Sequence, residues 1–297
     1  MKLGIVSDEI ARDFATAVRV GVSLGLRRYE IRHLAAGRAP MCGEAAMHEV
    51  ERIARGEGVE ITALSPGLFK NTEDAAAFRH EMDQVYPRAV EWAHRWKLPG
   101  LIVFGFHKPG ATEATAPEFS SARPPGEVVE WLAEAGERAR GDGLTLMIEP
   151  EPICWCDSGR ATAGLIARAG GVGLKINYDP GNVAWLENRD PLDEFAVVAP
   201  WIANVHVKDL RPLTRGAGCP EWVPAGEGMI DYAAHFRGLR EIGYQGPVSL
   251  EPHMDSSAEA TRRCKEACER AKPHLALDNS CRPPAAETEY TVDDGGS

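Results

Sequence analysis

Strand-like apolar runs alternate with helical segments along the chain, and this alternation limits the possible folds more than any other feature. The runs with strand character cover residues 2–6, 27–31, 59–64, 101–104, 144–148, 172–178, 201–207 and 245–250. Because helical segments separate them, consecutive strands are expected to be parallel and joined by crossover helices. Eight such units fit a single α/β domain of the closed (β/α)8 type, a TIM barrel, over residues 1–278. An open doubly wound sheet is the alternative.

Helical periodicity follows several of these runs, and it is clearest over residues 43–55, 72–96, 162–168 and 192–198. Asp231 is placed to cap a further helix. Two connections, residues 105–125 and 209–229, are long and have no clear period. Loops of this length in compact domains usually serve function or are disordered. Both follow strands, so we expect them at the end of the barrel where active sites lie.

The bulk composition limits the partners and the compartment. A net charge of −11 argues against a nucleic-acid-binding surface, which would be basic. The apolar runs are too short to span a membrane, and the chain enters strand-like sequence at once, without a signal peptide. Seven scattered cysteines favour reduced thiols in the cytoplasm. Residues 279–297 are Pro-rich and then acidic, and we expect a flexible tail there.

A residue type that binds metals stands at or near the end of each of the last four strand-like runs. In chain order these residues are Glu149, Asp179, His206 and Glu251. The carboxyl ends of barrel strands converge on one mouth, so the four side chains are expected to meet there. Three carboxylates and one imidazole suit Mn²⁺, Mg²⁺ or Co²⁺ with coordination positions left open for a substrate. The alternative for each acid alone is an ion pair at the barrel rim.

Several short stretches carry a resemblance to a known family. They are Tyr-Glu-Ile-Arg at 29–32, Ser-Pro-Gly-Leu-Phe-Lys at 65–70, Tyr-Asp-Pro-Gly-Asn at 178–182, Val-His-Val-Lys-Asp at 205–209, Gly-Glu-Gly-Met-Ile-Asp at 226–231 and Ile-Gly-Tyr-Gln-Gly-Pro-Val-Ser-Leu-Glu at 242–251. On these stretches the sequence resembles the xylose isomerase-like barrel superfamily of sugar isomerases and epimerases. The resemblance covers essentially the whole barrel.

The resemblance implies one metal ion, with Mn²⁺ preferred over Mg²⁺ or Co²⁺, on the four residues named above. In the ketose 3-epimerases of the superfamily the two glutamates also move the proton, so it implies that Glu149 and Glu251 are the catalytic pair. Those epimerases often have a substrate-contacting His three residues after the metal Asp, and this chain has Asn182 there. Arg211 matches an arginine that holds substrate oxygens in them.

Further side chains near the mouth are candidates for substrate contact, each with a structural alternative. They are Glu30, His107, Lys208, Trp185 and His253. For Glu30 the alternative is an ion pair with a neighbouring arginine, and for Lys208 it is an ion pair with Asp209. Trp185 is suited to stacking on the apolar face of a sugar or to covering the core.

These features predict a divalent-metal-dependent isomerase or epimerase that abstracts a proton from a sugar or keto-sugar through a metal-stabilised enediolate. A lyase on the same site, either a keto-polyol dehydratase or an enzyme eliminating from a 3-keto-glycoside, begins with the same proton abstraction. A non-catalytic sugar-binding or partner subunit is the alternative from another class, and a homo-oligomer is compatible with the sequence. Nucleotide-cradle motifs are absent from the chain.

Overall fold

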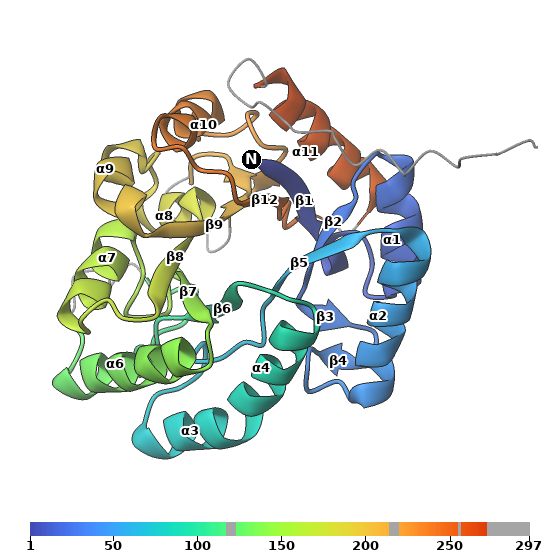
Figure 1. The fold of residues 1–297 in the computed structure, drawn as a ribbon. Helices are drawn as coiled ribbons and strands as arrows, with labels where there is room; N and C mark the ends of the chain where they lie inside the picture. Colours follow the sequence, from blue (N-terminus) through green and yellow to red (C-terminus); the bar gives the residue numbers. More distant parts are fainter. Residues whose placement is uncertain (117–122, 214–219, 255–256, 272–297) are drawn as a thin grey trace, which may run out of the picture.

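The strand-like runs form one eight-stranded parallel sheet that curls into a barrel, with helices around its outside (Figure 1). The computed structural model describes residues 1–116, 123–213, 220–254 and 257–271. The barrel strands are β1 (Lys2–Val6), β2 (Arg28–Ile31), β5 (Glu60–Leu64), β6 (Gly100–Phe104), β7 (Thr145–Glu149), β8 (Leu174–Tyr178), β9 (Ile202–Val207) and β12 (Pro247–Leu250).

The strand order shows how the barrel closes. The order in the sheet is β5-β2-β1-β12-β9-β8-β7-β6, so the first strand pairs with the last, and the two ends of the sheet, β5 and β6, lie next to each other. An open doubly wound sheet would leave its ends apart, so the predicted barrel is confirmed. The expected tail at 279–297 lies outside the described residues, as do residues 117–122 and 214–219 of the two long connections.

Helices connect consecutive strands and cover the barrel. They are α1 (Phe14–Ser23), α2 (Glu44–Glu57), α3 (Ala75–His80), α4 (Tyr86–Arg95), α6 (Gly126–Gly141), α7 (Gly159–Arg168), α8 (Pro180–Glu187), α9 (Phe195–Val198), α10 (Tyr232–Glu241) and α11 (Ala258–Arg270). The side chain of Asp231 accepts a hydrogen bond from Ala234 N at 3.0 Å, which confirms the predicted cap of α10. In the described residues no helix combines the length and apolar content that crossing a bilayer requires.

The helix predicted over residues 72–96 changes character in its middle. A π-helical segment, Glu81–Val85, joins α3 to α4. Pro87 lies in the first turn of α4 and has no backbone N–H, so one bond of the regular α-helical ladder is missing at this junction. Periodicity predicts a uniform α-helix here, and the structure differs from it by this wider, π-helical turn.

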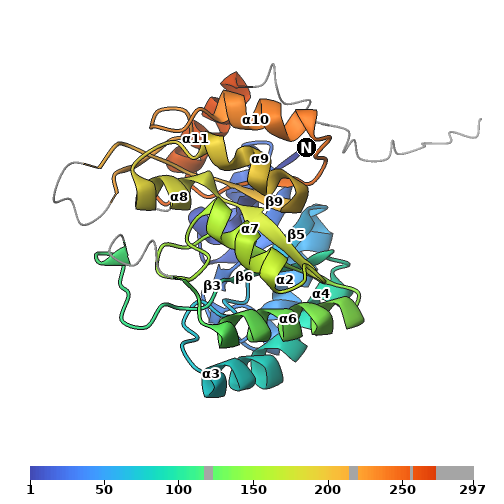
Figure 2. The ribbon, with the colours of Figure 1, turned by 90° about the vertical axis from the view of Figure 1, so that its left-hand side faces the viewer.

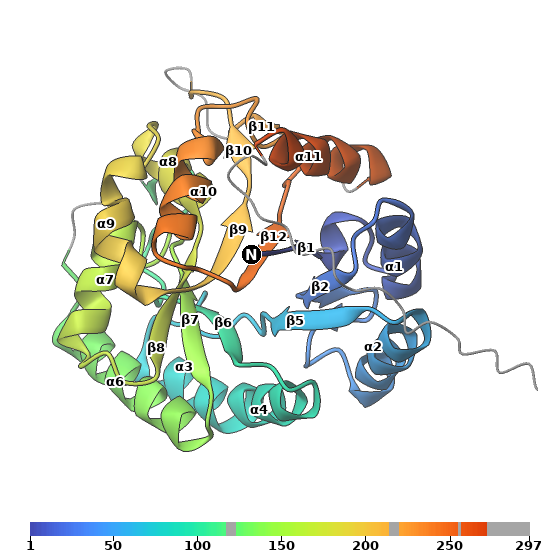
Figure 3. The same cartoon turned by 45° about the horizontal axis from the view of Figure 1, so that its top comes forward.

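The sequence pattern missed three short elements at the carboxyl ends of the strands. The strands β3 (His33–Leu34) and β4 (Gly37–Arg38) form a small hairpin after β2 (Figure 1). Beyond β9, β10 (Asp209–Leu210) pairs with β11 (Trp222–Val223) (Figure 3). Helix α8 begins directly after Asp179, where Pro180-Gly181 resembles a turn in the sequence. All three elements contribute residues near the site described below. The segments around residues 105–116 and 209–213 extend from the same end of the barrel (Figure 2).

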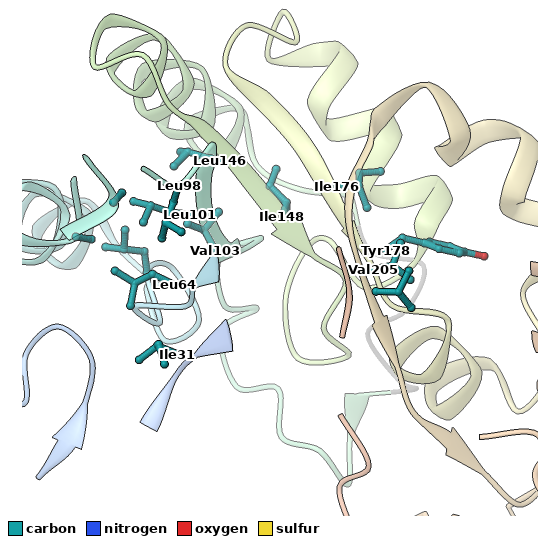
Figure 4. Packing of buried hydrophobic residues seen from close by; sticks show 14 of the residues in the cluster. Ile31, Leu64, Leu98, Leu101, Val103, Leu146, Ile148, Ile176, Tyr178 and Val205 are labelled. Carbon is teal, nitrogen blue, oxygen red and sulfur yellow. The ribbon is translucent and has the colours of Figure 1, made fainter. Parts of the chain in front are cut away.

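Alternating side chains of the strands divide the molecule into an outer core and a barrel interior. Labelled pairs two residues apart pack between strands and helices (Figure 4), namely Leu101 and Val103, Leu146 and Ile148, and Ile176 and Tyr178. Ala63, Ile102 and Met147, on three neighbouring strands, form a small separate apolar cluster. Polar residues occupy other buried positions of the strands, and these build the site.

Candidate metal centre and substrate cavity

The four predicted metal ligands come together at the carboxyl ends of neighbouring strands. Glu149 ends β7, Asp179 follows β8, His206 lies in β9 and Glu251 follows β12. One potential ligand atom from each of them lies within 4.8 Å of the others, and all four residues are buried. The strand order β7-β8-β9-β12 explains this meeting, because each of these strands pairs with the next.

The two carboxylate oxygens of Asp179 have different roles, one in capping a helix and one in the ligand cluster. Its Oδ1 accepts a hydrogen bond from Asn182 N at 3.0 Å and so caps α8, whose first residue is Pro180. Its Oδ2 is buried and has no well-aligned hydrogen bond. The cap fixes the orientation of the carboxylate, so Oδ2 is directed at the ligand cluster.

The unsatisfied oxygens of the cluster fit a cation. Oε2 of Glu251, like Oδ2 of Asp179, is buried without a well-aligned hydrogen bond. The Lys208 ammonium lies 2.8 Å from each of these two oxygens and 3.8 Å from Glu149 Oε1. Buried carboxylates are costly without positive charge beside them. This donor set of hard oxygens and one imidazole therefore suits a divalent ion, and Lys208 places an intrinsic cation at its edge.

Lys208 itself is fully charged in this setting. Burial opposes its charge, but the carboxylates of Asp179 and Glu251 outweigh burial and raise the pKa of Lys208 well above its usual range. The reciprocal effect acts on Glu251. Burial raises the pKa of Glu251, but Lys208 and then His206 outweigh burial and hold this pKa well below its usual value.

A buried polar layer orients the His206 ring. Its Nε2 lies 2.7 Å from Glu30 Oε2, and its Nδ1 lies 2.9 Å from Glu251 Oε2 and 3.5 Å from Glu149 Oε2. Burial disfavours the charged ring, yet Glu30 and then Glu251 outweigh burial and raise the pKa of His206 well above its usual value. A carboxylate behind a ligating imidazole fixes its orientation and increases its basicity.

Three protein side chains hold the Glu30 carboxylate in place. Ser249 Oγ donates to its Oε1 at 2.6 Å, and Asn204 Nδ2 donates to the same oxygen at 2.8 Å. Asn177 continues the network, because its Nδ2 donates to Glu149 Oε2 at 3.1 Å. Glu30 was predicted to contact substrate or to pair with an arginine. It lines the cavity, and its side chain contacts a histidine, an asparagine and a serine.

A cavity of about 410 Å³ opens over the cluster. Pockets for small molecules typically have volumes of roughly 300–1,000 Å³. Five of the residues predicted to bind substrate line it, namely Glu30, Asn182, Trp185, Lys208 and His253. Asn182 Nδ2 donates to Glu149 Oε1 at 3.1 Å, so this amide also positions a ligand.

Two predicted substrate contacts have partners away from the cavity. His107 Nδ1 lies 2.9 Å from Glu73 Oε1, and the His107 backbone forms a bridge with Cys154. Arg211 pairs with Glu221 at 2.9 Å, and both side chains are more than half exposed. Among the described residues neither His107 nor Arg211 belongs to the cavity lining.

Arg32 is a cavity residue that the sequence reasoning did not assign to the site. Its Nη1 pairs closely with Glu251 Oε1, and its Nη2 lies 2.8 Å from Glu9 Oε1 and 3.0 Å from Asp8 Oδ2. The signal that identifies it is its spacing, since Arg32 lies two residues after the inward-facing Glu30 and so faces the same side.

Aromatic side chains form one wall of the cavity. The rings of Trp222 and His253 stack with centroids 5.1 Å apart, and Trp185 meets Trp222 edge-on at 6.1 Å. His253 Nε2 also lies 3.2 Å from Glu251 Oε1. Trp222 belongs to β11, whose existence the sequence did not reveal. Aromatic faces of this kind suit the C–H face of a sugar ring or chain.

Lys70 and Glu151 form a second charged pair on the cavity wall. Their Nζ and Oε2 atoms are 2.9 Å apart. Burial raises the pKa of Glu151 above its usual value, and Lys70 only partly opposes this. Lys70 is therefore neutralised by a neighbour, like Arg32 and Lys208.

Known proteins share parts of this sequence and its fold. L-ribulose-5-phosphate 3-epimerase UlaE of Shigella flexneri serotype 5b (strain 8401) is 31% identical over 145 residues, which is 49% of each chain. The chain thus spans about half the length of the curated relatives it matches. The IOLI protein with a bound zinc atom superposes with a TM-score of 0.73 at 16% identity, covering 93% of this chain and 100% of the other.

A further solved structure, the probable 3-DHS dehydratase AsbF from Bacillus anthracis, has a TM-score of 0.69 at 18% identity and covers 91% of this chain and 99% of that one. At these identities the two structures show a shared fold. The family model described as xylose isomerase-like TIM barrel matches residues 18–274, which include every ligand of the cluster. The chain belongs to the xylose isomerase-like TIM barrel family.

Proposed function

We propose that this protein is a divalent-metal-dependent epimerase or isomerase of a keto-sugar. One observation carries the proposal: the ligand atoms of Glu149, Asp179, His206 and Glu251 lie within 4.8 Å of one another beneath a cavity of monosaccharide scale. The family match and the epimerase UlaE among the relatives support it. A carbohydrate is the proposed small-molecule partner.

The four ligands would hold the ion through three carboxylates and one imidazole. When bound, such an ion polarises a substrate carbonyl as a Lewis acid and acidifies the neighbouring C–H bond. Mn²⁺ is the ion we propose, with Mg²⁺ and Co²⁺ as alternatives of similar ligand preference. The chain's own residues then orient the substrate and move the proton.

The two glutamates have different surroundings, and this difference fits an acid–base pair. Two cationic side chains, Arg32 and Lys208, lie beside Glu251 together with the His253 ring, and the cations keep Glu251 ionised, the form in which a carboxylate accepts a proton. Glu149 accepts hydrogen bonds from the side-chain amides of Asn177 and Asn182, and Lys208 lies farther from it, 3.8 Å from Oε1, than from Glu251. A carboxyl with cations farther away carries a proton at lower cost than one with cations beside it.

The proposed reaction is a proton transfer at carbon. Glu251 takes the proton from the carbon next to the carbonyl, the C–H electron pair becomes a C=C bond, and the carbonyl oxygen takes up the negative charge. The Lys208 ammonium lies close enough to the ligand cluster to stabilise that oxygen. Return of a proton to the opposite face by Glu149 inverts the carbon. Return of the proton to the former carbonyl carbon moves the carbonyl instead, and the hydroxyl proton of the first carbon then passes to the former carbonyl oxygen.

Solvent isotope exchange tests the proposal. Metal-loaded protein is incubated in D₂O with free ketoses and with L-ribulose 5-phosphate, and the products are followed by NMR. We expect deuterium beside the carbonyl together with an epimer or an isomer. Deuterium entry accompanied by loss of water would instead identify the lyase alternative. Complete retention of the C–H signal on all ketoses, in protein shown to contain metal, would contradict an enzyme of either kind and favour a sugar-binding subunit.

A further inference from the structure

The cavity contains a cationic side chain that has no acidic partner. Arg38, in the hairpin strand β4, donates from Nε to Ser65 O at 3.2 Å and from Nη2 to Ser65 Oγ at 3.0 Å. Over the described residues, no carboxylate lies within ion-pair distance of its guanidinium. The remaining N–H groups of the fork are free to meet a ligand, since a guanidinium carries five donors. Burial, followed by repulsion from Arg32, lowers the pKa of Arg38 to about 10.

Other cations of the cavity differ from Arg38 because protein carboxylates neutralise them. Arg32 is paired with Asp8, Glu9 and Glu251. Lys70 is paired with Glu151 at 2.9 Å. Because their charges are already compensated, Arg32 and Lys70 are poorly suited to bind an anion from solution. They are therefore not part of the same binding surface as Arg38.

Two more cavity residues belong with Arg38. Arg12 lines the same cavity, and no ion pair links it to the described residues. His33, in β3 of the same hairpin, lies 3.6 Å from Asp8 Oδ2. Burial and then repulsion from Arg38 lower the pKa of His33, and attraction to Asp8 only partly opposes them. Arg12, Arg32 and Arg38 all line the same cavity. Among the described residues, Arg38 and Arg12 are thus cationic residues of the cavity wall without an ion-pair partner.

The ring of Phe104 supports the orientation of Arg38. The guanidinium carbon lies 6.0 Å from the centroid of this ring, at the end of β6, and Ser65 holds the opposite side of the fork. A guanidinium fixed by hydrogen bonds and by an aromatic ring loses less conformational entropy on binding than a free one. Its planar donors match the geometry of a carboxylate or a phosphate.

We infer that Arg38, with Arg12 and His33, forms a subsite for an anionic group of the substrate, a carboxylate or a phosphate, while the metal centre receives the keto group. The inference deepens the proposed function and rests on it only for the place of the keto group at the metal centre. A negatively charged ligand satisfies the free donors of Arg38 and offsets the positive charge of Arg38 and Arg12. A neutral sugar does neither.

Binding of matched probes tests the subsite. The metal-loaded protein is titrated calorimetrically with L-ribulose 5-phosphate, with L-ribulose, and with D-fructuronate against D-fructose, so that each anionic probe has a neutral partner. We expect at least one anionic probe to bind roughly 10- to 100-fold more tightly than its neutral partner, the usual weight of a charge-assisted hydrogen bond. Which anionic probe shows the preference distinguishes a phosphate from a carboxylate. Equal affinity within both pairs overturns the inference.

Substitution locates the effect. Arg38→Met should remove most of the preference for the anionic probe and leave the affinity for the neutral one within about threefold, and Arg38→Lys should restore part of it. Arg52→Met is the matched control, because Arg52 is an exposed arginine of α2 paired with Glu49. Equal losses for both probes in Arg38→Met would assign Arg38 a structural role and overturn the subsite. The wild-type comparison decides the question if the variant does not fold.

The outcomes for the subsite and for the proposed function are separable. Tight binding of an anionic probe without isotope exchange would refute the epimerase or isomerase and keep the subsite. Isotope exchange on neutral and anionic ketoses with equal affinity would keep the reaction and refute the subsite.

Discussion

Glu30 Oε2 lies 2.7 Å from His206 Nε2, so the carboxylate of β2 holds, from a non-adjacent strand, the ring whose other nitrogen faces Glu251 after the neighbouring strand β12. This pairing makes Glu30 a positioning residue for a ligand. We expect Glu30→Gln to weaken Mn²⁺ binding by about 10- to 100-fold, the range typical of partners behind a metal-ligating histidine. Calorimetric titration of the metal-free variant measures it.

The control for this variant is Glu60→Gln, which changes an exposed carboxylate of β5 that is paired with Arg28. Its Mn²⁺ affinity should equal that of the wild type. Unchanged Mn²⁺ affinity in Glu30→Gln would mean that the ring keeps its orientation through Asn177 alone.

Lys208 competes with a metal ion for the same carboxylates. Its ammonium lies 2.8 Å from Asp179 Oδ2 and from Glu251 Oε2. Lys208→Met should therefore tighten Mn²⁺ binding, because two buried carboxylates lose their intrinsic cation, and should lower the thermal midpoint of the metal-free protein. Isotope exchange should fall by roughly 10²-fold or more, because an oxyanion-stabilising donor is lost.

Titration calorimetry and thermal denaturation with and without a chelator separate these effects. Lys175→Met, at a residue whose ammonium donates to Pro200 O on the exposed side of β8, is the matched control. Weaker Mn²⁺ binding in Lys208→Met would contradict competition and would indicate that Lys208 orients the ligands.

The sequence was sufficient to predict the barrel and the meeting of four candidate ligands because both depend on local signals. Each strand is an apolar run of its own, and Glu149, Asp179, His206 and Glu251 stand at corresponding ends. Convergence of those ends follows from the closed sheet alone. The same reasoning placed Lys208 and His253 near the mouth, where the cavity includes both.

The parts that the sequence did not predict depend on contacts between distant residues. The pairing of Arg32 with Glu251 spans 219 positions in the chain. Arg38 reaches the cavity only because β3 and β4 form a hairpin of two residues each, too short for a periodic pattern. Helix α8 was missed because Pro180-Gly181 resembles a turn, although a proline at the first helical position after an Asp cap is favourable.

Asp190 links the loop after α8 to the start of α10 and makes the stability depend on pH. Its Oδ1 lies 2.8 Å from His235 Nε2, and its Oδ2 accepts from Asp231 N at 2.7 Å. Burial raises its pKa, but these hydrogen bonds outweigh burial and lower it below 3.8. A carboxyl group whose pKa is lower in the folded than in the unfolded protein stabilises the fold at pH values above its unfolded pKa. This stabilisation is lost as the pH falls through its folded pKa.

Asp190→Asn should therefore lower the free energy of unfolding by about 1 kcal/mol at pH 7, a value reduced for partial exposure. The difference from the wild type should stay constant down to about pH 5 and shrink as the pH falls below 3.8, the unfolded value. Urea denaturation at several pH values measures it, with the exposed Asp83→Asn as control. A difference that grows in acid would contradict the assignment.

Glu251 is both a proposed ligand and the proposed base, and one substitution separates these roles. Glu251→Gln keeps the shape and one acceptor oxygen but removes the charge that Arg32 and Lys208 stabilise. Mn²⁺ should bind more weakly, and excess Mn²⁺ should partly refill the site. Exchange of the substrate C–H with D₂O should still be depressed by about 10²- to 10⁴-fold, the usual weight of a positioned general base.

The measurement is the rate of deuterium entry at saturating Mn²⁺, with metal content determined in the same sample. Asp179→Asn is the comparison, because Asp179 is a proposed ligand whose Oδ1 is occupied by the cap of α8. Exchange in this variant should recover with added Mn²⁺, as for a ligand without a role in proton transfer. Full recovery in Glu251→Gln as well would limit Glu251 to metal binding. The proton would then pass through another cavity side chain, and His253, 3.2 Å from Glu251, is the next position to substitute.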